Sequence, residues 1–428
     1  MREMKDSGIE WVGAIPQDWQ LSKIGSLYTQ RNEKVSDKDY QPLSVTMQGI
    51  LPQLATAAKT DDGDNRKLVR VGDFAINSRS DRRGSCGISP LDGSVSLINI
   101  ILTPRTAMHP GYYNWLFHTT LFADEFYKWG HGIVADLWTT RWQEMKSITV
   151  PVPEYAEQER IAAFLDAECA EIDAVLEKTR ASIEEYKKLK QAVITQAVAK
   201  GVRGDRPMKD SGIEWIGDIP AEWDVVRQKY FWNTVESGVS VNAADKPVDN
   251  SEQYGVLKTS AVSKFVFIPT EHKQVNLEEY GRVSCPVRAD SIIASRMNTP
   301  ELVGACGYVQ NNYPNLFLPD RLWQITFKDG LSPKYAWYYL SGIRVRQYIS
   351  SLSTGTSSSM QNISQSQYGN IFITIPSIGE QSEITKYLDE KCRSVDALVT
   401  KKQQYLTEIE NYKKSLIYEY VTGKKEVV

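Results

Sequence analysis

An eight-residue segment that occurs twice constrains this chain more than any other feature. Met4–Trp11, with the sequence Met-Lys-Asp-Ser-Gly-Ile-Glu-Trp, returns unchanged at Met208–Trp215. The similarity continues to Trp19 and Trp223, and it resumes at larger spacings along the 428 residues. A period of about 200 residues is far longer than that of solenoid repeats, so we predict two duplicated units.

The two copies agree at their ends and differ in their middles. Matching pairs include Ser78-Arg79 with Ser295-Arg296, and Cys86 with Cys306. Because the spacing grows from 204 to 223 residues along the chain, the second copy is longer by 19 residues. This pattern indicates two copies that share a scaffold and differ in a variable module.

Composition divides each copy into a strand-rich module and a helical segment. Residues 1–155 and 206–378 are rich in β-branched and aromatic residues, in short runs bounded by turn residues, such as 322–327. Such runs are typical of strands. One helix is expected in each module, over 111–129 and 333–351, because a proline stands at or just before the start of each stretch. The modules are therefore predicted to be α+β.

Residues 156–205 and 379–428 are expected to form two long helical spacers, which end near Gly201 and Gly423. The apolar residues that recur at heptad spacing are Ile161, Leu165, Ile172, Leu176, Ile183, Ile384, Leu388, Val395, Val399 and Leu406. A long helix cannot bury such a seam alone, so the two helices should pack against each other. We predict an α+β fold with two strand-rich modules in tandem, separated by two long antiparallel coiled-coil-like helices, and an internal pseudo-two-fold repeat.

The composition is that of a globular protein. The chain has 50 Lys and Arg against 53 Asp and Glu, which excludes a polybasic tail that binds nucleic acid by charge alone. No apolar run is long enough to span a membrane, and the N-terminus lacks the apolar core of a secretory signal. Five cysteines without a Cys-x-x-Cys pair predict reduced thiols that fill the core, and a cytoplasmic location.

Motifs that would carry catalysis are missing from the sequence. It contains no phosphate-binding Gly-x-x-x-x-Gly-Lys-Ser/Thr loop and no Asn-Pro-Pro-aromatic segment of the kind that amino-methyltransferases use. The four histidines have no metal-ligand spacing. We therefore expect no catalytic or metal-binding residues, which favours a binding or assembly protein.

A loop rich in arginine and asparagine is the first candidate binding surface of each module. Its candidate residues are Asn77, Arg79, Ser80, Arg82 and Arg83 in the first module and Arg296 and Asn298 in the second. Arginine can pair with phosphate or with guanine edges, and asparagine with adenine. Structural bonding to loop carbonyls is an equal alternative for Arg79 and Arg296, whereas a functional surface is favoured for Arg82 and Arg83.

The polar segment after Gly132 and Gly355 is the second candidate surface. Its candidate residues are Arg141 in the first module and Ser357, Ser358, Gln361 and Asn362 in the second. Very different chemistry at one place in a repeat is expected of two binding modules with different targets. A divergent surface loop is the alternative.

With these features, the chain resembles the specificity subunits of type I restriction–modification systems. The resemblance covers essentially the whole chain. It rests on the repeated blocks at 4–19 and 208–223, on the Pro-x-x-x-Glu-Gln-x-x-Ile-x-x-x-Leu-Asp segments at 153–166 and 376–389, and on Tyr-Val-Thr-Gly-Lys at 420–424. The first copy lacks this last ending.

The resemblance implies a non-catalytic subunit that recognises a bipartite, asymmetric sequence in double-stranded DNA. Residues 1–155 and 206–378 would be its two target-recognition domains, and the helices would fix the length of the unread spacer. It also implies assembly with two adenine methyltransferase subunits and two restriction–translocase subunits. S-adenosylmethionine, ATP and Mg²⁺ are expected in those partners, and no cofactor is expected in this chain.

Two other classes of function stay open at this point. One is a protein-only scaffold with duplicated interaction modules and a helical hub, and the other is a diverged nuclease or methyltransferase. Residues 1–155 and 206–378 each carry nearly equal numbers of acidic and basic residues. If the modules bind DNA, their positive charge must be confined to one face, and partner subunits should supply much of the affinity.

Overall fold

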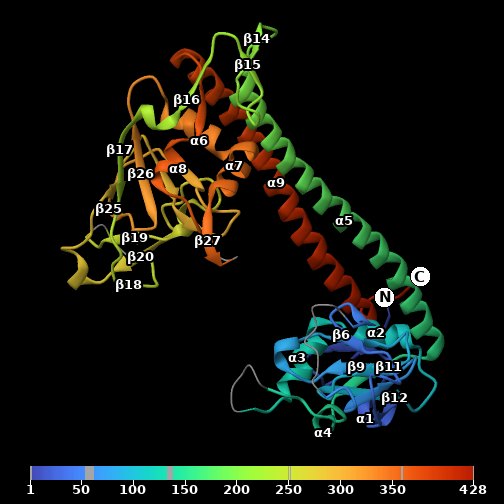
Figure 1. Ribbon diagram of the computed structural model, residues 1–428. Coiled ribbons are helices and arrows are strands. Elements are labelled where there is room, and N and C mark those ends of the chain that lie inside the picture. Colours follow the sequence, from blue (N-terminus) through green and yellow to red (C-terminus); the bar gives the residue numbers. More distant parts are fainter. Residues whose placement is uncertain are drawn as a thin grey trace. The chain divides into compact units, whose positions relative to one another are not determined.

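The computed structural model describes residues 2–53, 62–132, 138–248, 250, 252–357 and 360–427. The chain divides into two compact units. Unit 1 is Met1–Ala181 with Gln403–Val428, and unit 2 is Ser182–Lys402. Each unit contains one module and a stretch of both long helices (Figure 1). Each compact unit therefore combines a module with parts of both long helices, whereas the sequence-based division treats modules and helices as separate segments.

The centre of unit 1 is an antiparallel sheet in the order β10-β9-β12-β4. Both faces are buried, because Phe74 and Leu102 point into one apolar cluster while Ala75 and Ile101 point into another. Smaller sheets are β11-β8-β5, β6-β7, β13-β3 and β1-β2. The strands are β1 Met4–Asp6, β2 Ala14–Pro16, β3 Gln20–Lys23, β4 Tyr28–Arg31, β5 Lys34–Val35, β6 Leu43–Thr46, β7 Gly49–Pro52, β8 Arg66–Val69, β9 Phe74–Asn77, β10 Cys86–Ile88, β11 Gly93–Val95, β12 Asn99–Pro104 and β13 Thr149–Val152.

The centre of unit 2 repeats this order as β24-β22-β26-β17. Unit 2 adds a five-stranded sheet, β18-β20-β19-β25-β21, and a three-stranded sheet, β23-β28-β27; β14-β15 and β16-β29 are two-stranded. The strands are β14 Met208–Asp210, β15 Asp218–Pro220, β16 Asp224–Arg227, β17 Trp232–Ser237, β18 Ala243–Ala244, β19 Gly255–Leu257, β20 His272–Val275, β21 Pro286–Val287, β22 Ser291–Ser295, β23 Met297–Asn298, β24 Cys306–Val309, β25 Tyr313–Phe317, β26 Leu322–Phe327, β27 Thr354–Ser357, β28 Met360–Asn362 and β29 Phe372–Ile375. The predicted strand at 322–327 is confirmed.

The strand registers correct the alignment of the two copies by one residue. Cys86 lies opposite Ile76, and its counterpart Cys306 lies opposite Ala294. Likewise Asn99 lies opposite Asn77, and Leu322 lies opposite Ser295. The counterpart of Arg79 is therefore Met297, and Arg296 corresponds to Ser78. The shared Ser-Arg dipeptide misled the sequence-based match, because strand pairing rather than local identity fixes the register.

The short helices also differ from the prediction, because each expected single helix is two helices. Thr119 separates the first pair and caps α3, where its hydroxyl accepts the Phe122 N–H at 3.2 Å. Gly342 separates the second pair in an extended conformation. The helices are α1 Ile24–Leu27, α2 Pro110–Phe117, α3 Thr120–Lys128, α4 Trp142–Met145, α5 Tyr155–Lys200, α6 Pro333–Ser341, α7 Ile343–Leu352, α8 Gln365–Gly369 and α9 Ile378–Val421.

The long helices α5 and α9 run antiparallel within each unit (Figure 1). In unit 1 the contacts are Phe164 with Tyr420, Asp173 with Lys413 and Arg180 with Glu410. In unit 2 Tyr186 meets Lys402 and Lys190 pairs with Asp396. Partner numbers fall along α9 as they rise along α5, which confirms the predicted antiparallel arrangement in each unit. Gly201 and Gly423 end the helices with φ of +77° and +70°.

The predicted apolar seam is covered partly by the modules rather than by the other helix alone. Ile161 and Leu165 belong to the core of unit 1, and Ile384 and Leu388 belong to the core of unit 2. Leu176 and Ile183 are also buried, whereas Ile172, Val395, Val399 and Leu406 are partly exposed. The ends of each helix are therefore integral parts of the module on which they pack.

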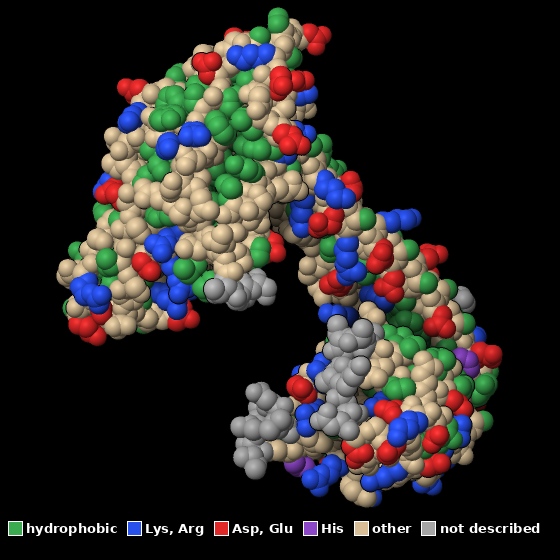
Figure 2. Space-filling view, in the orientation of Figure 1, with side chains coloured by type: hydrophobic (Ala, Val, Ile, Leu, Met, Phe, Trp, Pro, Cys, Tyr) green, Lys and Arg blue, Asp and Glu red, His purple; other side chains and the backbone are tan. Residues whose placement is uncertain are grey.

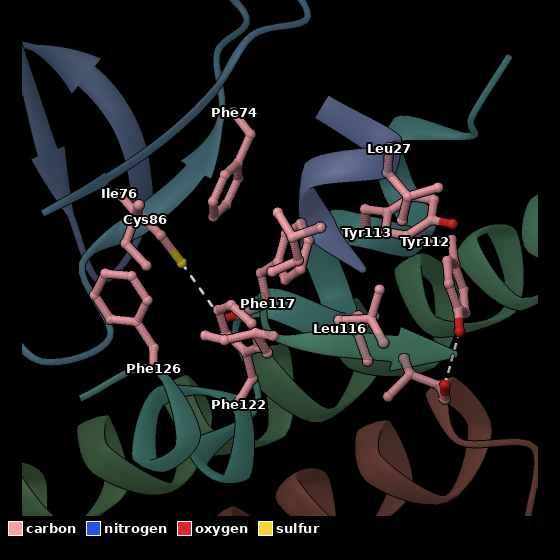
Figure 3. Close-up of a cluster of buried hydrophobic side chains, with 14 of the residues drawn as sticks. Leu27, Phe74, Ile76, Cys86, Tyr112, Tyr113, Leu116, Phe117, Phe122 and Phe126 are labelled. Atoms are coloured by element: carbon pink, nitrogen blue, oxygen red, sulfur yellow. Dashed lines mark hydrogen bonds between the residues drawn. The ribbon is translucent and has the colours of Figure 1, made fainter. Parts of the chain in front are cut away.

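An aromatic core holds α2 and α3 against the central sheet of unit 1 (Figure 3). Phe117 lies between Phe74 and Phe122, with ring centroids 4.5 and 4.7 Å apart. The Cys86 thiol donates to the Phe117 carbonyl at 3.4 Å, and burial raises the pKa of that thiol to about 12. Cys86 therefore stays protonated at neutral pH and fills the core, as predicted. All five cysteines are buried and free.

Candidate nucleic-acid interface

The two candidate surfaces of unit 1 lie side by side. The Ser80 N–H donates to the Trp138 carbonyl, and the Thr140 N–H donates to the Ser78 carbonyl, both at 3.0 Å. Arg79 therefore lies directly opposite Thr139 as an antiparallel pair. We call residues 78–83 and 138–141 the variable rim of unit 1.

Unit 2 joins its two candidate surfaces in the same way. Met297 of β23 lies opposite Asn362 of β28, and Asn298 lies opposite Gln361. The strand β27 extends this sheet on the other side of β28. We call residues 296–298, 354–357 and 360–362 the variable rim of unit 2.

The two variable rims are structurally equivalent. The corrected register relates Arg79 to Met297, and the spacing of 223 residues relates Thr139 to Asn362. The same cross-strand pair is thus Arg79–Thr139 in one unit and Met297–Asn362 in the other. The scaffold places different chemistry at one position, and two segments far apart in sequence form each rim.

The arginines of the unit 1 rim differ in how they are engaged. Arg79 and Arg141 are exposed, and neither forms an ion pair within the described part of the chain. Arg82 is 3.8 Å from Asp81, and Arg83 pairs with Asp124. Arg79 and Arg141 therefore have guanidinium groups available to a ligand.

Asn77 plays a different part from the predicted one. It is only 6 % exposed, and its carboxamide oxygen accepts the Arg79 N–H at 3.0 Å. The Tyr127 hydroxyl contacts the carbonyls of Asn77 and Arg82, each at 3.2 Å. Asn77 thus shapes the loop from inside, and a direct contact between its side chain and a ligand is excluded by its burial. Ser80 is partly buried and contributes its backbone N–H.

The unit 2 rim carries three amide side chains and a single arginine, Arg296. Asn298, Gln361 and Asn362 are partly exposed, and the Asn298 carboxamide oxygen accepts the Thr299 N–H at 2.9 Å. Arg296 is also partly exposed, and its backbone joins the rim to the sheet, since its carbonyl accepts the Ile363 N–H at 3.0 Å. Ser357 contributes backbone to β27. The predicted residue Ser358 lies outside the described residues.

A buried arginine, Arg346, holds the loop that follows the first segment of the unit 2 rim. Arg346 of α7 donates to the carbonyls of Val303, at 2.6 Å, and Glu301, at 3.2 Å. Its guanidinium also lies 4.9 Å from the centre of the Phe265 ring. Burial lowers the pKa of Arg346. Arg346 therefore fixes the loop that follows β23, a support that sequence reasoning missed because it joins three distant segments.

The repeated aromatic block anchors each module to the first turn of its long helix. In unit 2, Glu380 accepts hydrogen bonds from Trp223 Nε1 at 3.0 Å and from Arg206 at 2.6 Å. Arg206 also lies over the Trp223 ring, 5.1 Å from its centre.

Unit 1 repeats this arrangement with Arg2, Trp19 and Glu157, where the Trp19 hydrogen bond is 2.9 Å long. The adjoining glutamine fixes the next helix, because the Gln158 carboxamide accepts the His109 N–H just before α2, at 2.9 Å. The Gln381 carboxamide likewise accepts the Ser332 N–H just before α6, at 2.8 Å. The Glu-Gln dipeptide thus positions both the block and the start of the short helix α2 or α6.

The faces seen in Figure 2 carry Lys and Arg interspersed with Asp and Glu, as the near-neutral composition predicts. Across the described residues, no set of three or more His, Cys, Asp or Glu side chains is arranged to hold a metal ion. No helix in that part of the chain is both long and apolar enough to cross a membrane.

Comparisons with known proteins agree on one family. Residues 220–410 match the family model described as the type I restriction modification DNA specificity domain. The MjaVIII specificity subunit of Methanocaldococcus jannaschii is 24% identical, over 96% of this chain and 94% of its own length. The EcoKI specificity subunit of Escherichia coli is 20% identical, over 96% of this chain and 90% of its own length.

The fold is also similar to that of a solved structure. A chain described in work on complex assembly and conformational transition of the type I R-M system covers 96% of this chain and 99% of its own length. The TM-score is 0.71 at 16% sequence identity. The likeness therefore lies in the arrangement of the backbone over the whole chain.

Proposed function

We propose that this chain is a specificity subunit of a type I restriction–modification system, and that each variable rim contacts one half of a bipartite DNA sequence. Unit 1 would recognise one half-site and unit 2 the other. The two halves differ in sequence because the rims differ in chemistry.

One observation carries this proposal. An antiparallel pair stands at the equivalent position in both units, yet it is Arg79–Thr139 in one and Met297–Asn362 in the other. A position that mattered only for packing would keep similar side chains on an equivalent scaffold. A two-stranded antiparallel ribbon also fits the major groove of B-DNA, where base pairs are distinguishable.

The chain would act as the non-catalytic part of an assembly. We propose that it binds two adenine methyltransferase subunits and two restriction–translocase subunits in the cytoplasm. S-adenosylmethionine, ATP and Mg²⁺ would serve those partners. In unit 1, Asp81 and Asp124 pair with Arg82 and Arg83 and offset part of the positive charge of the rim, so phosphate contacts by the partners would supply much of the affinity.

The helices would set the distance between the half-sites. DNA advances about 3.4 Å per base pair and a helix about 1.5 Å per residue. Insertion of one or two helical turns after Thr179, with a matching insertion in α9, should lengthen the unread spacer and leave the half-sites unchanged. A methylated motif that keeps its original spacer would contradict this role.

The function is tested by expression of the chain with its methyltransferase subunits, followed by single-molecule mapping of methylated adenine. One bipartite motif is the expected result. Replacement of residues 20–150 by the module of another specificity subunit should change one half of the motif only. Sequence-independent methylation, or a chain that binds proteins and shows no salt-dependent, sequence-preferring DNA binding, would favour the protein-only scaffold instead.

A further inference from the structure

Arg79 occupies the position at which the two variable rims differ most in chemistry. We infer that the Arg79 guanidinium recognises a guanine in the half-site bound by unit 1, and that unit 2 has no equivalent contact. This assignment rests on the proposed function and names the base that the unit 1 rim selects.

The backbone directs Arg79 away from the sheet at a fixed place. Two backbone hydrogen bonds join the two segments of the rim, one from Ser80 to Trp138 and one from Thr140 to Ser78. They flank Arg79 on both sides. In this arrangement the side chains of directly opposite residues project to the same side of the ribbon, about 5 Å apart at their Cβ atoms. Arg79 therefore projects beside Thr139.

Arg141 strengthens the cationic character of the same face. It follows Thr139 by two residues and has an extended backbone, with φ −95° and ψ 167°. Residues two apart on an extended strand point to the same side. Arg79 and Arg141 therefore share one face of the rim.

The Arg79 side chain is available, while its backbone is held. It is exposed and forms no ion pair within the described residues, so its five N–H donors face solvent. Its own backbone N–H is bound by buried Asn77, and Tyr127 holds the carbonyls of Asn77 and Arg82. A donor group on a fixed backbone loses less entropy on binding than one on a mobile loop.

The shape of the guanidinium group favours a guanine edge as the ligand. The nearby carboxylates of Asp81, in the rim, and Asp124, on α3, pair with Arg82 and Arg83 and not with Arg79. Guanine presents its O6 and N7 acceptors side by side in the major groove, and this spacing matches two guanidinium donors. A bidentate contact to guanine therefore suits Arg79 better than a general attraction to DNA.

Unit 2 cannot make this contact, because Met297 has no donor at the equivalent position. Its neighbours there are Asn362, which lies opposite, and Asn298, which follows in β23. Arg296, which sequence comparison pairs with Arg79, is the counterpart of Ser78 instead. The guanine contact is therefore a property of unit 1 alone.

The test uses the chain in complex with its methyltransferase subunits and a library of DNA sites. Arg79→Gln should reduce the discrimination for G·C at one position of the unit 1 half-site by roughly 10- to 100-fold, since a good bidentate pair contributes about that factor. The other half-site should not change. Arg79→Lys, which keeps the charge but loses the fork geometry, should lose most of the same discrimination.

Arg70→Gln is the matched control, because Arg70 is an exposed arginine of unit 1 that pairs with Asp92 at 2.8 Å outside the rim. It should keep the wild-type motif. The module exchange over residues 20–150 identifies which half-site belongs to unit 1.

Three results would overturn the assignment. The first is a unit 1 half-site without a G·C pair, and the second is an Arg79→Gln complex with an unchanged motif. The third is a loss of methylation by the Arg79→Gln complex that is uniform across DNA sites and comes with a weaker salt dependence, which indicates a phosphate contact. In each case a bipartite motif in the wild-type complex leaves the proposed function standing. A wild-type complex without any sequence preference would overturn both.

Discussion

The central sheets of the two units have the same strand order, yet their variable rims carry different side chains. The order β10-β9-β12-β4 in unit 1 corresponds to β24-β22-β26-β17 in unit 2. Both units also place a helix pair on that sheet and join the rim from the same two segments. What differs is the chemistry of the rims, with four arginines in unit 1 and three amides beside a single arginine in unit 2. The comparison teaches that the scaffold fixes where recognition occurs, whereas the rim residues decide what is recognised.

The contacts that join each module to its long helix differ between the units in the opposite way. The same arginine, tryptophan and glutamate are present in both units, but the burial of the glutamate differs. Glu380 is almost fully buried, with a side chain 2 % exposed, whereas the equivalent Glu157 is 12 % exposed. Each arginine also pairs with a second, exposed carboxylate, Arg2 with Asp18 at 2.8 Å and Arg206 with Glu222 at 2.9 Å. The hydrogen bonds from Arg2 to the Glu157 and Asp18 carboxylates raise the pKa of Arg2. The same contact should therefore contribute unequally to the two units.

The largest expected effect comes from removal of these anchors. Glu380→Ala leaves the buried Trp223 N–H without an acceptor and Arg206 without its buried partner, so it should cost about 3–5 kcal/mol of stability. Glu157→Ala should cost less, because the Glu157 carboxylate is less deeply buried than that of Glu380. Urea unfolding with hydrogen exchange, which locates the unit that opens, measures both. Equal losses in the two units would contradict the difference in burial.

A smaller effect is expected where a module tyrosine binds the end of a long helix. The Tyr335 hydroxyl lies 2.7 Å from Thr374 Oγ1 and 3.3 Å from the Val198 carbonyl, while Tyr112 donates to the Val421 carbonyl at 2.8 Å. Loss of one hydrogen bond from a buried site costs about 1–2 kcal/mol.

Tyr112→Phe should therefore speed exchange at the end of α9, because Val421 has no second protein donor on its carbonyl among the described contacts. Tyr335→Phe should affect α5 less, since Thr374 also donates to the Val198 carbonyl at 2.8 Å. Hydrogen exchange at residues 195–200 and 418–423 reports on both helix ends. A larger change in α5 than in α9 would reverse this expectation.

The smallest effect concerns the junction between the paired short helices. Thr119→Ala removes the N-cap of α3 and should cost about 1 kcal/mol. Gly342 stands at the equivalent place in unit 2 without a side-chain cap and with a φ of −67°. Gly342→Ser should therefore be tolerated, with a gain of a few tenths of a kcal/mol if its hydroxyl caps α7. Thermal unfolding of both variants tests the contrast, and a loss from Gly342→Ser would show that the new Cβ is too close to the Tyr339 carbonyl.

Much of the fold could be predicted from the sequence because the two copies of the repeat can be compared with each other. The repeated block, the glycine stops Gly201 and Gly423 and the strand at 322–327 are local signals. Each depends on residues close together in the chain. The antiparallel helices could also be predicted, because a heptad seam needs a partner.

The site could be predicted only in outline. The two candidate segments of each module stand out by composition, but their pairing across the rim depends on contacts between residues about 60 apart. The division between buried Asn77 and exposed Arg79 likewise follows from the way β9 ends in the sheet. Identical dipeptides pointed to the wrong counterpart for Arg79, because a one-residue shift in strand register is invisible to a local match.

The sequence by itself determined that the chain is a duplication, that each copy joins a strand-rich module to a long helix, and which family it resembles. Those properties follow from the heptad spacing of apolar residues and from short segments that occur in both copies. Only the tertiary structure decided that Arg79 and Met297 are equivalent and that two distant segments form one rim. It also decided that Glu157 and Glu380 each hold an arginine and a tryptophan. Backbone hydrogen bonding fixes registers and burial fixes partners, and both arise only when residues distant in sequence come together.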